Sequence, residues 1–587
     1  MSVEKLITDH IDIWSSALQT RSTVGRGSNG KIDLYGIKKL RELILELAVR
    51  GKLVPQDPND EPASELLKRI AAEKAELIKQ GKIKKQKPLP EISEEEKPFE
   101  LPEGWEWVRF GDISEIERGG SPRPIKDYIT IDEDGLNWIK IGDTDIGGKY
   151  ISSAKEKIKA SGLKKTRMVY PGDFLLTNSM SFGRPYITLI EGCIHDGWLR
   201  ISPPLLLDKD FLYLLLSSPF IIKVFKEKAS GAVVLNLNAD KVREIFILIP
   251  PFAEQQRIVA KVNKLMSLCD QLEQQSLTSL DAHQQLVETL LATLTDSQNA
   301  EELAENWARV SQHFDTLFIT EASIDALKQT ILQLAVMGKL VPQDPNDEPA
   351  SELLKRIEQE KAQLVKEGKI KKQKPLSLIS EDEKIFSLPK GWVWVRLDDI
   401  CSGITSGSTP AKAIFNEFEG VPYLKVYNIR DQRIDFDFKP QFINEEYNDK
   451  KMKRSILYPG DVVMNIVGPP LGKVAIIPSN YSKWNCNQAI VYFRLMDEEV
   501  AKYIYIYLLA GMFLNSIELI GTAGQDNISV TKSRSIVIPL PPKSEQRKIK
   551  RIVEEMLLIC DTLKSRLQSA QQTQLHLADA LTDAALN

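Results

Sequence analysis

The sequence is poor in residues that bind metals or form disulfides. Its five cysteines and five histidines are scattered over 587 residues, with no C-x-x-C pair and no H-x-x-x-H pair. Structural zinc sites and disulfide frameworks require these residues at short, regular spacings. We therefore expect no metal site and no disulfide, and we expect the isolated cysteines to be small buried residues.

Long apolar runs are also missing. No stretch reaches the length of about eighteen apolar residues that a membrane-spanning helix needs. The first residues, MSVEKLITDHIDIW, lack the basic segment and the apolar core of a signal peptide. Both absences predict a cytoplasmic protein with no membrane partner.

Recognisable enzyme motifs are missing as well. The run GPPLGKV at Gly468 has the wrong spacing for a phosphate-binding loop and lacks its serine or threonine. The sequence contains no G-x-S-x-G nucleophile turn and no N-P-P-Tyr or N-P-P-Phe motif of adenine methyltransferases. Carboxylate pairs such as Asp398 and Asp399 are ordinary in a chain with 27% charged residues. We therefore predict no catalytic residues and no cofactor in this chain.

The chain has no excess of basic residues. Its formal net charge is −4 at pH 7, whereas nucleic-acid-binding proteins are commonly basic. This value weighs against DNA binding unless the basic residues gather on one face or a partner contacts the phosphates. With 587 residues and 42% hydrophobic content, the chain exceeds a single hydrophobic core and predicts two or more globular units.

The sequence does contain a long internal duplication. The run GKLVPQDPNDEPASELLKRI begins at Gly51 and begins again, unchanged, at Gly338. At the same spacing GKIKKQKPL recurs, and LPEGWEWVRFGDI returns as LPKGWVWVRLDDI. The copies then diverge, but IPPFAEQQRI at Ile249 and LPPKSEQRKI at Leu540 are alike again. Two matching scaffolds therefore flank two different inserts.

Each scaffold contains a long helix with a heptad pattern. After each Pro-Pro pair, one helix face recurs alternately four and three positions apart, which is typical of a coiled-coil seam. At about 1.5 Å per residue, the stretch from Ile258 to Leu290 would span roughly 50 Å, a length that suits a spacer. Ser276, Ser279 and His283 fall in the first seam and are expected to pack there rather than to catalyse. The predicted spacer-helix seam residues are Ile258, Val262, Leu265, Leu272, Leu286, Leu290, Ile549, Val553, Met556, Leu563, Leu567 and Leu577.

A second scaffold helix precedes each copy of the repeat. Its apolar positions recur at helical spacing, and each copy stops at a glycine, Gly51 or Gly338, where a left-handed cap fits. In the middle of the chain this helix follows the heptad helix, but at the ends one lies N-terminal and the other C-terminal. If the end pieces pair as the middle pieces do, the two chain ends must meet. This predicts a circularly closed arrangement with pseudo-two-fold symmetry.

The two inserts mix short β-like runs with glycine turns and apolar helical stretches, which predicts α/β domains. Their polar residues concentrate in loops such as RGGSPRP, TSGSTPAKA, KVYNIRDQR and GTAGQDNIS. Asn and Gln can pair with adenine, Arg and Lys with guanine, and hydroxyls with phosphates. The candidate DNA-binding residues are Ser121, Arg123, Lys140, Asn178, Ser179, Arg184, Asn236, Asn238, Ser408, Thr409, Lys412, Lys425, Asn428, Arg430, Lys473, Asn487, Gln488, Gln525 and Asn527.

This layout resembles the specificity subunit of type I restriction-modification enzymes over nearly the whole chain. Each insert opens with LP-x-G-W-x-W-V-R and closes with PP-x-x-EQ-x-x-I, and GSTP, YPGD, GKVAII, NQA and GQDNIS of the second insert are similar to the family pattern. The first insert departs from it, with GGSPRP for the GxTP form and HDGWLRI where NQAIVYF would stand.

The resemblance implies an α/β multidomain fold with two target-recognition domains separated by long antiparallel coiled-coil helices. The implied domains are an N-terminal helical region at 1–99, the first target-recognition domain at 100–249, a central helical spacer at 250–387, the second target-recognition domain at 388–540 and a C-terminal helix at 541–587 that pairs with the N-terminal region.

The resemblance also implies the function and the partners. Each domain would read one half of a bipartite, asymmetric DNA site, and the helices would set the gap between the halves. Two methyltransferase subunits would bring S-adenosylmethionine, and restriction subunits would bring ATP and Mg. Two alternatives stay open: a specificity subunit of another restriction system, whose one partner both modifies and cleaves, and a bivalent protein-binding scaffold.

Overall fold

The computed structural model describes residues 3–21, 31–83, 85–145, 147–178, 182–229, 236–416, 418–468, 470–517, 519–522 and 525–586. The chain forms two compact units. Unit 1 comprises residues 1–19, 33–277 and 571–587, and unit 2 comprises residues 20–32 and 278–570. Within the described ranges, no helix combines the length and the apolar character needed to cross a membrane.

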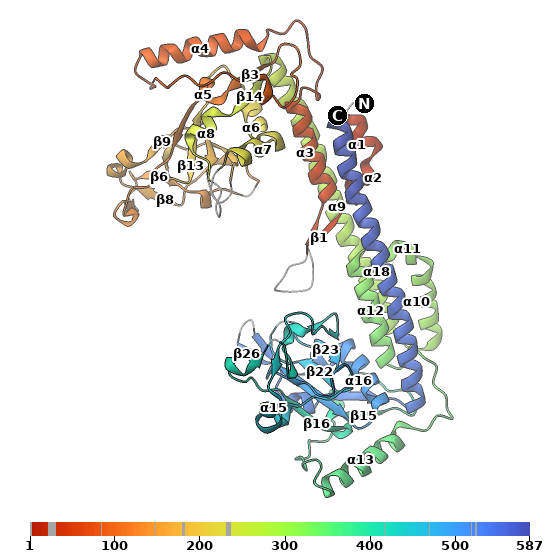
Figure 1. Cartoon of the computed structure of the whole chain (residues 1–587). Helices are drawn as coiled ribbons and strands as arrows, with labels where there is room; N and C mark the ends of the chain where they lie inside the picture. The colour runs from red at the N-terminus through yellow and green to blue at the C-terminus, as the bar shows by residue number, and fades with distance from the viewer. Residues whose placement is uncertain are drawn as a thin grey trace. The chain divides into compact units, whose positions relative to one another are not determined.

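The unit boundaries fall inside the two longest helices, α9 (Phe252–Asp296) and α18 (Lys543–Leu586). Each unit therefore contains one sheet-rich domain, part of α9 and part of α18 (Figure 1). The five consecutive segments expected from the sequence are grouped into these two units, because segments distant in sequence pack together.

The domain of unit 1 contains two five-stranded sheets and a two-stranded entrance ribbon. The sheet orders are β4-β13-β10-β11-β7 and β5-β8-β6-β12-β9, and β3 pairs with β14 at the entrance. Helix α6 packs against β11 and α7, while α3 contacts α6 and α7. The strands are β3 (Glu106–Arg109), β4 (Glu115–Arg118), β5 (Ile129–Thr130), β6 (Leu136–Ile139), β7 (Tyr150–Ile151), β8 (Glu156–Ile158), β9 (Arg167–Val169), β10 (Phe174–Thr177), β11 (Pro185–Thr188), β12 (Gly192–Ile194), β13 (Trp198–Ser202) and β14 (Phe246–Ile249). The helices of unit 1 are α1 (Val3–Asp9), α2 (Ile11–Ser16), α3 (Tyr35–Val49), α4 (Ala63–Lys79), α5 (Phe110–Ile113), α6 (Lys209–Ser217), α7 (Pro219–Lys228) and α8 (Ala239–Glu244).

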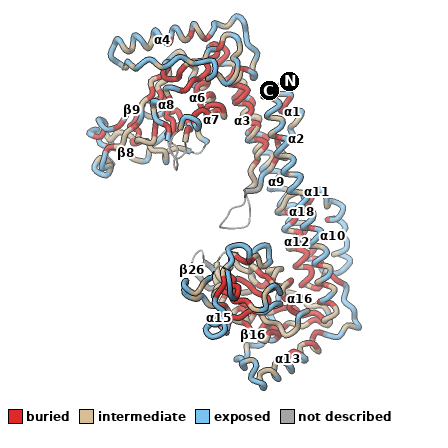
Figure 2. Tube along the Cα trace, viewed as in Figure 1, coloured by how far each residue is buried: buried red, intermediate tan, exposed pale blue. Residues whose placement is uncertain are grey.

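The domain of unit 2 has the same plan with two four-stranded sheets. Their orders are β16-β25-β22-β23 and β17-β21-β18-β24, and β15 pairs with β28 at the entrance. The apolar helix α16 packs on β22, β23 and β25, so the sheet interior is buried (Figure 2). The strands are β15 (Val393–Arg396), β16 (Cys401–Ser406), β17 (Phe415–Asn416), β18 (Val421–Leu424), β19 (Ile429–Arg430), β20 (Arg433–Ile434), β21 (Phe442–Ile443), β22 (Val462–Asn465), β23 (Val474–Ile476), β24 (Asn485–Cys486), β25 (Ile490–Leu495), β26 (Ile520–Thr522), β27 (Gln525–Asn527) and β28 (Val537–Leu540). The helices of unit 2 are α10 (Ala300–Gln312), α11 (Phe314–Leu317), α12 (Glu321–Val336), α13 (Ala350–Lys366), α14 (Leu397–Ile400), α15 (Glu445–Lys451), α16 (Glu498–Ala510) and α17 (Val530–Arg534). Strands β1 (Gln19–Arg21) and β2 (Lys31–Asp33) pair in a separate two-stranded sheet outside both sheet-rich domains.

The two chain ends meet within unit 1, as the duplication predicts. Tyr35 of α3 donates a hydrogen bond of 2.7 Å to Asp579 of α18, and Lys52 donates one of 2.5 Å to the carbonyl of Leu586. Because the contact made by Lys52, after α3, lies further along α18 than the contact made by Tyr35, helix α3 runs parallel to the end of α18. Arg41 of α3 also forms a 2.7 Å ion pair with Asp270 of α9.

Helix α3 also runs antiparallel to α9. Arg41 contacts Asp270, and the loop after α3 reaches further back, where Gln56 donates a 3.1 Å hydrogen bond to Glu254. In unit 2, Lys328 of α12 pairs with Asp561 of α18 at the duplicated positions of Arg41 and Asp270. Each unit therefore repeats the same helix packing and the same ion pair.

The predicted heptad seam is buried at the start of both long helices, but further along each helix the buried position moves to the next residue. Ile258, Val262 and Leu265 are at most 1% exposed. Leu286, however, is 52% exposed, while its neighbour Val287 is 2% exposed. The assignment of Leu286 to the seam is therefore wrong.

The same correction applies to α18 at the matching place. Leu577 is 41% exposed and Ala578 is fully buried, so Leu577 does not belong to the seam either. An α-helix has 3.6 residues per turn, so a strict seven-residue pattern drifts around it by about 20° per heptad. Without a tight supercoil, the buried stripe moves to the next residue after a few heptads. The remaining predicted seam residues, namely Leu272, Leu290, Ile549, Val553, Met556, Leu563 and Leu567, are buried or half-buried.

A buried glutamate makes the same contacts with both copies of the repeated loop. Glu254 Oε2 accepts a hydrogen bond from Trp105 (2.9 Å), and its other oxygen accepts one from Gln56 (3.1 Å). Trp392, Glu545 and Gln343 form the same triad in unit 2, at 2.9 and 3.1 Å. Burial raises the pKa of both glutamates. This triad fixes the loop, the domain entrance and the start of the long helix together.

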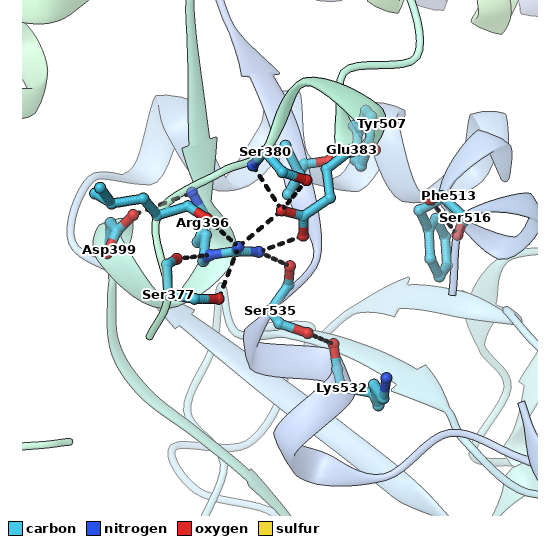
Figure 3. A network of polar contacts seen from close by, with 12 residues as sticks. Ser377, Ser380, Glu383, Arg396, Asp399, Tyr507, Phe513, Ser516, Lys532 and Ser535 are labelled. Atoms are coloured by element: carbon cyan, nitrogen blue, oxygen red, sulfur yellow. Dashed lines mark hydrogen bonds and ion pairs between the residues drawn. The ribbon is translucent and has the colours of Figure 1, made fainter. Parts of the chain in front are cut away.

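A buried arginine ties the preceding linker to each domain. Arg396 is 3% exposed and donates to the carbonyls of Ser377 (2.8 Å) and Ser535 (2.9 Å) and to Glu383 (2.9 Å), as Figure 3 shows. Arg109 makes the equivalent contacts with Glu96 and with the carbonyl of Glu244. The arginine holds the pKa of its glutamate partner below the usual range in both units. The domains are thus anchored at identical points, although their interiors differ.

Candidate nucleic-acid interface

The predicted recognition loops meet at one edge of each domain, held by matching backbone hydrogen bonds. Directly after β4, Gly119 donates to the carbonyl of Trp198 (2.9 Å) in unit 1, and directly after β16, Gly407 donates to that of Ile490 (3.0 Å) in unit 2. The next amides donate to the ends of β12 and β24. The loops RGGSP and SGSTP are therefore structurally equivalent.

Only glycine fits at this crossing. A Cβ on Gly407 would lie 2.0 Å from the carbonyl oxygen of Cys486, and one on Gly119 would lie 2.2 Å from that of His195. Real Cβ atoms do not approach a carbonyl so closely, so the backbones touch only because the side chain is missing. The glycine thus holds the first loop against the segment that carries HDGW or NQAI.

A second loop joins the same edge. Asn178 donates to the carbonyl of Gly197 (3.0 Å), and Ile466 donates to that of Ala489 (2.8 Å). The loop before the last short helix follows, because Leu237 donates to Asn178 and Ile528 to Ile466, each at 2.9 Å.

These contacts define two loop clusters. Loop cluster 1 comprises Gly119–Arg123, Thr177–Asn178, Gly183–Arg184, His195–Gly197 and Asn236–Asn238. Loop cluster 2 comprises Gly407–Ala411, Asn465–Val467, Gly472–Lys473, Asn487–Ala489 and Asn527–Ser529. In this correspondence His195 and Asp196 occupy the places of Asn487 and Gln488, and Arg184 occupies that of Lys473.

In loop cluster 1 the polar side chains converge on Asp196. Ser121 Oγ donates to Asp196 Oδ1 (2.7 Å), and the guanidinium of Arg123 lies 3.5 Å from Oδ2. The backbone carbonyl of Asp196 accepts from Asn178 Nδ2 (2.8 Å) and from Arg118 Nε (3.2 Å). The serine hydrogen bond is the main cause that holds the pKa of Asp196 below its usual value. The residue is therefore a charged acceptor among the recognition loops.

Next to it, the ring of His195 is enclosed by its surroundings. Its Nδ1 accepts a 2.7 Å hydrogen bond from the backbone of Gly197, and Trp138 and Trp198 flank the ring. Burial lowers the pKa of His195. The ring fixes the turn that presents Asp196.

Loop cluster 2 offers amide groups instead of a carboxylate. Asn487 donates through its backbone to Leu424 (3.0 Å), while its side-chain Oδ1 is buried without a hydrogen-bond partner. The Oδ1 atom of Asn527 is in the same state. A buried polar atom without a protein partner is uncommon and leaves an acceptor open to water, an ion or a ligand.

Basic and aromatic residues border loop cluster 2. The ammonium of Lys425 lies 4.9 Å from the ring centre of Phe415, and the guanidinium of Arg430 lies 4.3 Å from that of Phe438. Strands β19 and β20 form a hairpin, and Gln432 lies in its turn. The side chain of Gln432 accepts a hydrogen bond from the backbone of Val474 (2.9 Å), which joins the hairpin to the cluster. The hairpin therefore lies beside Lys473.

The candidates from the sequence differ in how far they face the solvent. Asn178 and Asn428 are 1% exposed, and their side-chain amides donate to backbone carbonyls, that of Asn178 to Asp196 in a neighbouring loop and that of Asn428 to Phe438. In this conformation they hold loops in place and present no free side chain. The exposed candidates are Arg123, Arg184, Asn236, Asn238, Thr409, Lys412, Arg430 and Gln488, and the half-buried ones are Ser121, Lys140, Ser408, Lys425, Lys473, Asn487 and Asn527.

Some candidates already have local roles. Asn238 caps α8 by accepting from Lys241 (2.8 Å), and Lys140 forms a 2.5 Å ion pair with Glu156. Ser179 and the side chain of Gln525 lie outside the described residues. Among the described residues, no group of three or more His, Cys, Asp or Glu side chains could hold a metal ion.

Comparison with known proteins adds the family. A family model for the type I restriction modification DNA specificity domain matches residues 102–282 and 389–571, so each match contains one loop cluster. The chain belongs to this family of type I restriction-modification DNA specificity proteins.

Two relatives cover the full length of this specificity chain. It is 52% identical over 608 residues to the type I restriction enzyme EcoEI specificity subunit of Escherichia coli, with 100% of both chains covered. It is 50% identical over 606 residues to the EcoAI specificity subunit of the same organism, again with 100% of both chains covered. A chain from a solved type I R-M system aligns with 84% of this chain and 99% of its own, at 19% identity and a TM-score of 0.48.

Asp196 is not among the candidates predicted from the sequence. The run HDGWLRI is distinguished there only by its departure from NQAIVYF, because no residue in it matches the family pattern. Aligning the two inserts would have identified Asp196. It is the fourth residue after Gly192 and falls at the position of Gln488, which was a candidate.

Proposed function

We propose that this specificity chain reads a bipartite, asymmetric DNA site, with one half-site for each domain. The observation that supports this is the pair of loop clusters, which share backbone hydrogen bonds but differ in side chains. Asp196 stands where unit 2 has Gln488, and Arg184 stands where it has Lys473. Base edges are read by side-chain donors and acceptors, so different side chains on one scaffold favour different half-sites.

The helices are proposed to act as a ruler. Helix α9 has 45 residues and α18 has 44, so each is about 65 Å long at 1.5 Å per residue. Half-sites about one helical turn of DNA apart lie on one side of the duplex, roughly 34 Å from centre to centre. Helices longer than this distance would keep the two recognition domains apart, and a fixed helix length would then set a fixed, non-specific gap between the half-sites.

Catalysis and phosphate contacts are assigned to partners. We propose that two methyltransferase subunits using S-adenosylmethionine dock on the helical scaffold, and that restriction subunits contribute ATP- and Mg-dependent translocation and cleavage. The chain itself is proposed to be non-catalytic and to work in the cytoplasm, where the host DNA lies. A net charge of −4 fits this division, since the partners would supply basic surface.

Mapping DNA methylation tests the proposal. The chain is co-expressed with its neighbouring methyltransferase, and methylated adenines are located by single-molecule sequencing. We expect a split motif with a constant gap, and an insertion that lengthens α9 and α18 equally should change the gap while both half-motifs stay the same. Methylation without a split motif would overturn the two-domain reading.

A binding measurement separates DNA recognition from a protein-binding scaffold. The assembled complex should bind a duplex that carries the motif, and its affinity should fall as salt is raised, because bound protein releases counterions from the phosphates. A purified active complex with no salt-dependent DNA binding would favour the scaffold function instead.

A further inference from the structure

Asp196 is the point at which three loops of loop cluster 1 meet. Its carboxylate accepts from Ser121 and faces Arg123, and its backbone carbonyl accepts from Asn178. The side chain is nevertheless 42% exposed, so it remains accessible from outside. A carboxylate fixed by its surroundings and open to solvent is suited to contact a ligand.

The chemistry of a carboxylate restricts that ligand. An ionised carboxylate only accepts hydrogen bonds, and it repels phosphate. In the major groove, the donors on base edges are the N4 amino group of cytosine and the N6 amino group of adenine. A DNA-facing aspartate therefore finds a favourable contact only with one of these amino groups.

The geometry leaves one oxygen available. Oδ1 holds the serine hydrogen bond at 2.7 Å, whereas Oδ2 faces Arg123 at 3.5 Å. The side chain of Arg123 is 82% exposed, and such exposed pairs are weak. Arg123 can therefore leave Oδ2 and contact a neighbouring guanine or phosphate when DNA binds, which frees Oδ2 for a base.

We propose that Asp196 determines specificity in the first half-site by accepting a hydrogen bond from a base amino group in the major groove. The proposal rests on the proposed function of the domain, and it adds the residue and the chemical group that it reads. In unit 2 the equivalent position is Gln488, an exposed amide that both donates and accepts. The two domains therefore differ in hydrogen-bonding character at the same place.

The test compares variants of Asp196 in the assembled, methylating complex. Asp196→Ala removes the acceptor, and Asp196→Asn keeps the shape and an oxygen for Ser121 but removes the charge. For both variants we expect discrimination at one base pair of one half-motif to fall by roughly tenfold or more, the size of a lost direct base contact. The other half-motif serves as an internal control and should stay unchanged.

Two further variants exclude a structural explanation. Ser121→Ala removes a hydrogen bond to Asp196 but leaves the carboxylate, so it should weaken methylation without changing the preferred base. Gln488→Ala should change only the half-motif that the Asp196 variants leave intact. If Asp196→Ala reduces activity by unfolding the domain, Asp196→Asn decides, since it is nearly isosteric.

The outcomes are distinct. An unchanged preference at every position of both half-motifs in an active Asp196→Asn complex would overturn the proposal for Asp196. So would the same change of base preference in Ser121→Ala. The absence of any split motif with the unmodified chain would instead overturn the proposed function of the domains.

Discussion

Tyr35 and Asp579 lie 544 positions apart in the chain, yet the phenol of Tyr35 donates a 2.7 Å hydrogen bond to the carboxylate of Asp579. Lys39 lies 3.2 Å from the same carboxylate. Both contacts join the first scaffold helix to the last one inside unit 1. The duplicated scaffold is therefore completed by the two ends of the chain, and each domain has a full set of supporting helices.

Removing the carboxylate at this junction should loosen unit 1. Asp579→Ala eliminates the hydrogen bond from Tyr35 and the ion pair with Lys39, and we expect the free energy of unfolding to fall by about 1 kcal/mol, because the site is partly exposed. The exposed Asp583 lies one turn later in α18, and Asp583→Ala is the matched control. Chemical denaturation of the full chain gives the comparison. Equal effects of the two substitutions would contradict a specific closure.

The glycine at the loop crossing should be indispensable for the second domain. In Gly407→Ala the new Cβ would lie 2.0 Å from the carbonyl of Cys486, so the loop must move and we expect about 2 to 4 kcal/mol of destabilisation. Gly403 lies in the preceding strand, where a Cβ would be 3.7 Å from Tyr492 and meets only ordinary contact. Gly403→Ala should therefore be tolerated.

The readout for this pair is the methylation motif of the complex. Gly407→Ala should abolish or relax only the half-motif read by unit 2, whereas Gly403→Ala should leave both half-motifs intact. Normal recognition by Gly407→Ala would show that the crossing is not part of the interface.

The scaffold could be predicted from the sequence because its signals are local. Gly51 and Gly338 end their helices with φ of 67° and 71°, which confirms the predicted left-handed caps. The same close approach occurs in both copies, since a Cβ at either glycine would lie within 2.4 Å of Pro102 or Pro389. Each copy of the loop therefore needs glycine where it meets the domain entrance.

The recognition loops could be predicted only as loops. Asn178 and Asn428 have the residue type of a base contact, yet both are buried in backbone hydrogen bonds. Asp196 carried no motif, and its importance appears only when three loops separated in sequence come together. Which side chain faces outward depends on turn geometry, which residue spacing alone does not define.

The buried arginine at each domain entrance should contribute strongly to stability. Arg396→Ala removes the ion pair of Glu383, which keeps its hydrogen bond from Ser380, and leaves the carbonyls of Ser377 and Ser535 without their donor. We expect a loss of about 2 to 3 kcal/mol. Arg356→Ala in α13 breaks only an exposed pair with Glu348 and should have little effect. Thermal unfolding of the two variants checks this. A small shift for Arg396→Ala would mean that the linker is not tied to the domain.

The stability of the first domain should fall at mildly acidic pH because of His195. Burial lowers its folded pKa below the ordinary value of 6.5. As pH falls below 6.5, the unfolded chain binds a proton that the folded domain disfavours, so stability decreases until the folded pKa is passed. Asp196 and Asp143 favour the proton and Lys140 opposes it, but burial dominates.

Hydrogen exchange between pH 7 and pH 5 measures this effect, after correction for the intrinsic exchange rate. Peptides containing residues 193–202 should lose protection as pH falls, whereas peptides containing residues 486–495, where Asn487 replaces the histidine, should not. His195→Asn should remove the pH dependence in the first domain. The same loss of protection in both domains would rule out His195 as its source.

The slip of the buried stripe in α9 leads to opposite effects for two adjacent residues. Leu286 falls on the strict heptad but is 52% exposed, whereas Val287 is 2% exposed and packs with Leu291 and Leu294. Val287→Asp places an unpaired charge in this core and should lower the free energy of unfolding by about 3 kcal/mol or more. Leu286→Asp adds a charge on the outer face and should change it by less than about 0.5 kcal/mol. Circular dichroism of the helices during denaturation distinguishes the two variants. A larger effect for Leu286→Asp would mean that the buried stripe keeps the seven-residue pattern and does not move to Val287.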